Sequence, residues 1–152
     1  MNRADAEQLL TIPKSGDPPS RWEQKSSHAN AMVIAFGLTD GIGATIPGLT
    51  ATMEWQPGKR FRHPTLLLSL FQLQYGVPER IYQLEICAAD HPSHREGTTM
   101  FFGAHEHIGV ATEMLPQYSG ISFADALAIF CQRATLTLEG PIPAPDEFTL
   151  TP

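Results

Sequence analysis

Four histidines lie in one short segment of this chain, at His91, His94, His105 and His107. Imidazole changes its charge near neutral pH more readily than other side chains, and it is the commonest metal ligand in proteins. The spacing of His105 and His107 places both rings on the same face of a β-strand, because side chains alternate along a strand. We therefore expect any chemistry of this protein to be in this segment.

A metal site is the first hypothesis for these residues. If the turn that carries His91 and His94 folds over the strand that carries the other two, four imidazoles would satisfy a tetrahedral ion. Three of them with one open position would suit a catalytic divalent transition metal such as zinc. Glu85 or Asp90 would supply an oxygen ligand or orient a ring. The spacing matches no established metal motif, so solvent-facing hairpin histidines are the alternative.

The second hypothesis uses the same residues without a metal. His105 and His107 would act as general acid and general base, which is enough to cleave RNA through its own 2′-hydroxyl. Arg95 would stabilise the charge that develops at phosphorus, and His91 or His94 would be auxiliary. This hypothesis requires no cofactor.

Other reactive residue types are less informative. Cys87 and Cys131 are isolated, which predicts two buried free thiols in a reducing compartment rather than a disulfide framework. No serine lies in a GxSxG context. One basic cluster with an interleaved aromatic ring is either a nucleic-acid contact or a solvated turn. It consists of Lys59, Arg60, Phe61, Arg62 and His63.

Length and charge limit the classes of function. A chain of 152 residues predicts one domain with a real core. The formal net charge of −6 repels nucleic-acid phosphates, so an RNA contact would need a local basic patch. Neither a secretory signal nor a membrane-length apolar run is visible, and we expect a cytoplasmic protein without membrane contact.

The elements that would position the histidines are mostly strands. We expect a helix at Asp5–Leu10 within a flexible segment, residues 1–21, followed by a single domain over residues 22–152. Apolar content or period-two alternation predicts strands at Ala31–Leu38, Leu49–Trp55, Arg80–Ala88, Thr98–Phe102 and His105–Val110, with a polar turn at Asp90–Gly97. The run Thr65–Tyr75 suits a buried helix or a strand, and its two-sided alternation favours a strand.

The C-terminal part should supply a helix and an arm. Ser122 is a candidate N-cap for a helix that ends at Ala134, where Arg133 suits the helix dipole. The Pro-rich arm, residues 141–152, would lie on the body through Ile142 and Phe148. Together these elements predict an α+β fold: a mostly antiparallel, meander-like sheet of five to six strands with the helix packed on one face.

The stretch RIYQLEICAADHPSHREGTTMFFGAHEHIGV, together with SFADALAIFCQ, resembles small bacterial families in which a His-bearing turn precedes an HxH strand and a short terminal helix. Some of these families are toxins of toxin–antitoxin modules or belong to phage-like elements. The resemblance covers about residues 78–135. It implies a cytoplasmic bacterial protein that acts on RNA or another intracellular target and is held by a cognate partner.

Two functions follow from these observations. One is a toxin-like RNA-acting protein that uses the histidine cluster. The other is a non-catalytic protein-interaction module in which the histidines are structural or bind metal weakly. Low charge and apolar strands also predict a homodimer or a tight complex with a cognate protein.

Overall fold

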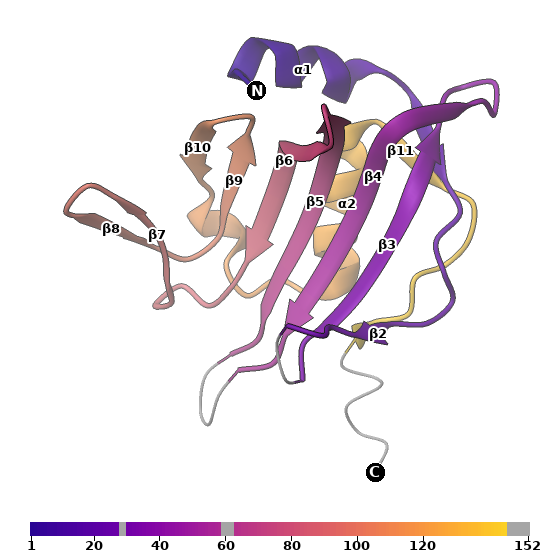
Figure 1. The fold of residues 1–152 in the computed structure, drawn as a ribbon. Helices are drawn as coiled ribbons and strands as arrows, with labels where there is room; N and C mark the ends of the chain where they lie inside the picture. Colours follow the sequence, from indigo (N-terminus) through magenta and orange to yellow (C-terminus); the bar gives the residue numbers. More distant parts are fainter. Residues whose placement is uncertain (28–29, 59–62, 146–152) are drawn as a thin grey trace.

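A large, mostly antiparallel sheet dominates the computed structural model, which describes residues 1–27, 30–58 and 63–145 (Figure 1). Its strands follow the order β10-β9-β6-β5-β4-β3-β1-β11, with β2 paired to β3. These strands are β1 (Lys14–Gly16), β2 (Glu23–Gln24), β3 (Met32–Thr39), β4 (Thr45–Gln56), β5 (Thr65–Gln74), β6 (Val77–Ile86), β9 (His105–Ile108), β10 (Ala111–Met114) and β11 (Leu136–Leu138). The described strands outnumber the expected five or six, while the α+β class and the antiparallel sheet are confirmed.

The two faces of the sheet differ in chemistry, as strand alternation predicts. Along β4, Leu49, Ala51, Met53 and Trp55 are buried, whereas the threonines and the glutamate between them are half-buried. The run Thr65–Gln74 is a strand and not a helix, and it pairs with β4 and β6. One face therefore carries the core and the other carries polar groups.

Helix α2 (Phe123–Ala134) covers the core face (Figure 1). Its N-cap is Ser122, whose hydroxyl accepts a hydrogen bond from the backbone nitrogen of Asp125, as the sequence predicts. Phe130 is fully buried and stacks on Tyr82 of β6, with ring centroids 5.8 Å apart. The opposite face of the sheet has no helix over it in the part of the chain that the structure describes.

The N-terminal segment differs from the flexible stretch expected for residues 1–21. Helix α1 (Arg3–Thr11) lies across one end of the sheet and buries Ala6 and Leu10, and β1 joins the sheet between β3 and β11. Two apolar positions on a short helix gave too weak a pattern to show this docking. Ile142 of the C-terminal arm is buried as expected, while Phe148 lies outside the described residues.

A separate hairpin forms from part of the expected polar turn, Asp90–Gly97, and from the strand expected at Thr98–Phe102. Strands β7 (Pro92–Glu96) and β8 (Thr99–Phe102) pair with each other and project beside the edge of the large sheet (Figure 1). The residues of β7 are mostly polar and show no apolar alternation, so the sequence did not indicate a strand there. A short 3-10 helix, η1 (Pro116–Tyr118), leads from β10 toward α2.

Two further expectations can be placed. Cys87 is buried and Cys131 half-buried, both as free thiols, and burial raises the pKa of each to about 11. Neither is therefore an ionised nucleophile. Of the basic cluster, residues 59–62 lie outside the described part of the chain, and His63 is exposed. None of the described helices is long and apolar enough to cross a membrane.

Candidate functional site

Strand β9 carries two histidines on one face and a glutamate on the other. His105 and His107 are 1% and 6% exposed and point to the face opposite α2, whereas Glu106 points into the core. The Glu106 carboxylate accepts a hydrogen bond from the Tyr82 hydroxyl at 2.9 Å and one from Arg133 at 2.7 Å. These two donors anchor the buried carboxylate, and they fix which face receives the histidines.

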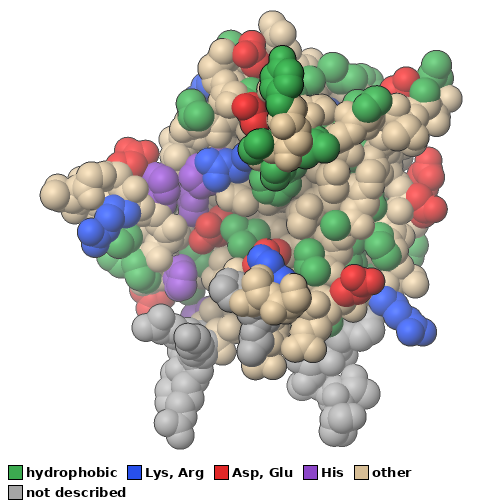
Figure 2. Space-filling model, viewed as in Figure 1, with side chains coloured by type: hydrophobic (Ala, Val, Ile, Leu, Met, Phe, Trp, Pro, Cys, Tyr) green, Lys and Arg blue, Asp and Glu red, His purple; other side chains and the backbone are tan. Residues whose placement is uncertain are grey.

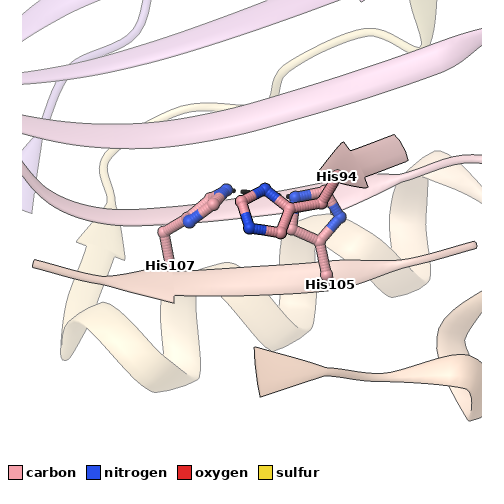
Figure 3. A group of neighbouring side chains, drawn as sticks. All are labelled: His94, His105 and His107. Atoms are coloured by element: carbon pink, nitrogen blue, oxygen red, sulfur yellow. Dashed lines mark hydrogen bonds between the residues drawn. The ribbon is translucent and has the colours of Figure 1, made fainter. Parts of the chain in front are cut away.

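The rings of His94, His105 and His107 converge in space (Figure 3). Each offers one ring nitrogen, and the three nitrogens all lie within 4.8 Å of one another. Nε2 of His105 lies 3.0 Å from Nε2 of His107, so one ring donates and the other accepts. Three imidazoles from two separate segments of the chain therefore share one small volume.

The β7–β8 hairpin delivers the third ring. His94 stacks on Phe101 of the paired strand, and its ring centroid lies 5.5 Å from that of His105. Gly103 joins the hairpin to β9 at a φ of +84°, and a Cβ atom there would lie 2.6 Å from Oγ of Ser119. The Gly103 carbonyl also accepts a hydrogen bond from the Ser93 hydroxyl at 2.7 Å. The return of the chain at this glycine thus brings β7 to β9.

Neighbouring strands supply two groups around the three rings. Oε2 of Glu85, on β6, lies 3.6 Å from Nε2 of His105. The Thr112 hydroxyl, on β10, lies 3.0 Å from Nδ1 of His107. In contrast, Nδ1 of His105 is buried without a hydrogen-bond partner in the described part of the chain. The Thr112 hydroxyl is a partner of the kind that orients metal-ligating imidazoles, because it contacts the nitrogen that does not face the other rings.

Burial sets the charge state of the cluster. It lowers the pKa of His107 to about 3, helped by the positive charge of Arg80. It also lowers the pKa of His105, against a smaller opposing contribution from the Gly103 backbone. Burial raises the pKa of the Glu85 carboxyl to about 7. Both strand histidines are therefore neutral at physiological pH, which is the form that binds metals.

Two further polar residues of β6, Arg80 and Gln83, lie next to the histidines. Arg80 donates a hydrogen bond from Nη1 to the Gln83 side chain at 3.4 Å, and Gln83 in turn donates to the Ser69 hydroxyl at 2.8 Å. Gln83 pairs with His107 across the β6–β9 ladder. Purple histidine atoms lie next to blue basic atoms on this open face, at the base of the hairpin (Figure 2).

The structure brings together only part of the predicted set. His94, His105 and His107 meet, and Glu85 lies beside them as considered from the sequence. His91 is not in the group of converging nitrogens. Arg95 is exposed on β7, one residue from His94, and alternation directs it away from the rings.

Asp90 is exposed and outside the group. Arg80 and Thr112 were missed by the sequence reasoning. Both residues lie on strands that pair with β9, but the sequence does not reveal the order of strands in the sheet.

No family model, curated protein or solved structure matches this chain. The chemistry of the site therefore rests on its geometry.

Proposed function

We propose that this protein binds a divalent transition metal of the zinc type through His94, His105 and His107 and uses it for hydrolytic chemistry. The observation that carries the proposal is the convergence of one nitrogen from each ring within 4.8 Å. Nitrogen ligands of a tetrahedral zinc ion are about 3.3 Å apart, given bonds of about 2.0–2.1 Å. The 3.0 Å between the His105 and His107 nitrogens is close to that spacing.

Three protein ligands favour a catalytic rather than a purely structural site. Structural zinc sites are closed by four protein ligands, whereas three leave a position for water or substrate. A metal ion in such a site supplies a Lewis acid that activates water for hydrolysis. Oε2 of Glu85 lies 3.6 Å from Nε2 of His105, on the side of the ring that faces the metal position, where the carboxylate would accept a proton from the water.

The metal-free acid–base hypothesis has less support. The nitrogens that would act on a substrate face each other at 3.0 Å instead of standing apart. A general acid of this type also needs an imidazolium, and burial opposes that form in both rings. RNA as the substrate and a toxin-like role in a bacterial cytoplasm stay predictions, and metal-assisted hydrolysis of a phosphodiester is compatible with them.

Metal titration tests the proposal. Protein stripped with a chelator is titrated with Co(II), and the visible absorption of the bound ion is recorded together with the metal content by mass spectrometry. We expect one equivalent in the wild type. His94→Ala should weaken binding by more than the about 10–100-fold that outer-shell changes cause, because it removes a ligand. This side chain is on the hairpin and is 22% exposed, so its loss leaves the core intact.

His91→Ala is the matched control, because His91 lies on the same connection and outside the converging group. It should bind Co(II) like the wild type. Equal affinity in His94→Ala and His91→Ala, or no uptake by the wild type, would remove the metal site and leave the non-catalytic interaction module as the better hypothesis.

A further inference from the structure

Arg80 is a half-buried cation without an acidic partner in the described part of the chain. Its one side-chain hydrogen bond goes to the neutral Gln83 at 3.4 Å, and its Nε is buried with no partner. The two acids of the same strand are engaged elsewhere: Glu79 pairs with the amino group of Met1 at 3.2 Å, and Glu85 contacts His105. A buried donor left unpaired is costly, and such groups are frequent at functional sites.

A β-bulge turns Arg80 toward the histidine face. The β5–β6 ladder shifts register so that Tyr82 pairs with Leu70 but Arg80, not Ile81, pairs with Phe71. With regular alternation through Ile81, Arg80 would share the core face of Tyr82. Bulges often redirect a side chain next to an active site. The redirected guanidinium lies beside Gln83, which pairs with His107 across the β6–β9 ladder. Its positive charge also lowers the pKa of both His105 and His107.

We infer that the open side of the three-histidine site binds a phosphoryl oxyanion between the metal and the guanidinium of Arg80. This inference rests on the proposed function and names its substrate class. A divalent ion and the guanidinium of Arg80 together offer a positive charge that a phosphate dianion matches better than a carboxylate. The planar fork of arginine also suits phosphate oxygens. Arg80 thus takes the role that the sequence suggested for Arg95.

The test is a phosphate titration of the Co(II)-loaded full chain. Inorganic phosphate is added at constant pH and ionic strength, and its binding is measured by calorimetry and by the change in Co(II) absorption. We expect Arg80→Gln to weaken phosphate binding about 10- to 100-fold, as for a lost hydrogen-bonded charge, with Co(II) affinity retained. Arg95→Gln is the matched control and should leave phosphate binding unchanged. Acetate should bind more weakly than phosphate to the wild type.

Each outcome is decisive. Equal phosphate affinity in the Arg80 and Arg95 variants, or acetate binding as tight as phosphate, would overturn the oxyanion site while the metal site stands. Failure of the wild type to take up Co(II) would overturn both. If Arg80→Gln does not fold, Arg80→Lys keeps the charge without the fork, and wild-type phosphate affinity in that variant would also count against the inference.

Discussion

The side chain of Thr112 contacts the nitrogen of His107 that does not face His105. Its hydroxyl lies 3.0 Å from Nδ1, which leaves Nε2 directed toward His105. When a metal binds Nε2, the Nδ1–H group would donate to the threonine oxygen. We expect Thr112→Val to lower Co(II) affinity about 10- to 100-fold, because the shape is kept and the orienting hydrogen bond is lost.

Thr52→Val serves as the comparison for this residue. Thr52 is a half-buried threonine on the polar face of β4, two strands beyond the histidine ladder. Co(II) titration of both variants should show a loss for Thr112→Val alone. Similar affinities in the two variants would mean that the threonine hydroxyl does not orient the ring.

Glu106 shows why a residue can be misread in isolation. It stands between two histidines on an expected strand, where a charged side chain is typically solvent-facing, yet it is 4% exposed. Its partners Tyr82 and Arg133 come from β6 and α2, both distant along the chain. A charged side chain is buried only where partners of this kind satisfy it, and the residues adjacent in sequence do not indicate that such partners exist.

At the scale of elements, the β7–β8 hairpin is the part of the site that does not pair with the large sheet. It forms its own two-stranded sheet, and His94 is the residue that it contributes to the proposed metal ligands. A metal held by one ring on the hairpin and two on β9 would join the hairpin to the large sheet. We expect hydrogen exchange of the β7–β8 amides to slow by up to about 100-fold when free metal exceeds Kd about 100-fold.

The His94→Ala variant separates this effect from general stabilisation. At a metal concentration that still fills the remaining ligands, the hairpin amides should exchange at the metal-free rate. Amides in the centre of β4, paired on both sides, provide the reference. Slowing of the same size in the hairpin and in β4 would show that the metal stabilises the whole fold instead.

The elements themselves were largely predictable where their patterns are local. The alternation of β4 and the cap and apolar spacing of α2 depend on neighbours a few residues away, and both predictions agree with the structure. The hairpin strand β7 was not predicted, because its residues Pro92–Glu96 are exposed or half-buried and carry no apolar alternation. Pairing with β8 alone makes it a strand.

At the scale of the whole molecule, Lys14 joins the two ends of the described fold. It is 3% exposed, and its ammonium donates to the carbonyl of Ile12 after α1 at 2.6 Å and to that of Ala134 in α2 at 2.8 Å. Cations suit helix C-termini. Burial nevertheless lowers the pKa of Lys14 from 10.5 to about 8.

The lowered pKa of Lys14 predicts the direction in which stability changes with pH. Between pH 8 and 10.5 the unfolded chain holds a proton on Lys14 that the folded chain has released, so stability rises with pH in that window. The free energy of unfolding of the wild type, minus that of Lys14→Met, should increase by about 1 to 3 kcal/mol across it. Denaturant titrations at pH 7.5 and pH 10.5 measure the difference, and a flat or falling difference would contradict the expectation.

Association is the remaining property at this scale. The homodimer and the cognate partner expected from low charge stay predictions. Among the exposed large apolar side chains, Leu73, Tyr75 and Val77 lie together at the β5–β6 turn, whereas Ile42 and Val110 lie at other turns. Their exposure does not by itself define an interface.

The sequence by itself determined the α+β class, the faces of β4, the cap of α2 and the shared direction of His105 and His107. Each of these follows from the geometry of a strand or helix over a few residues. It also drew attention to the histidine segment, from which three rings converge in the structure. These features need no knowledge of where distant parts of the chain lie.

Tertiary structure alone decided that His94 joins the pair while His91 does not, and that Arg80 rather than Arg95 is the nearby cation. The first depends on how the hairpin returns at Gly103. The second depends on a bulge in β6 and on β6 lying beside β9. Such contacts arise from packing between segments far apart in the chain. The alternation of side chains within one strand does not indicate which other strands lie beside it.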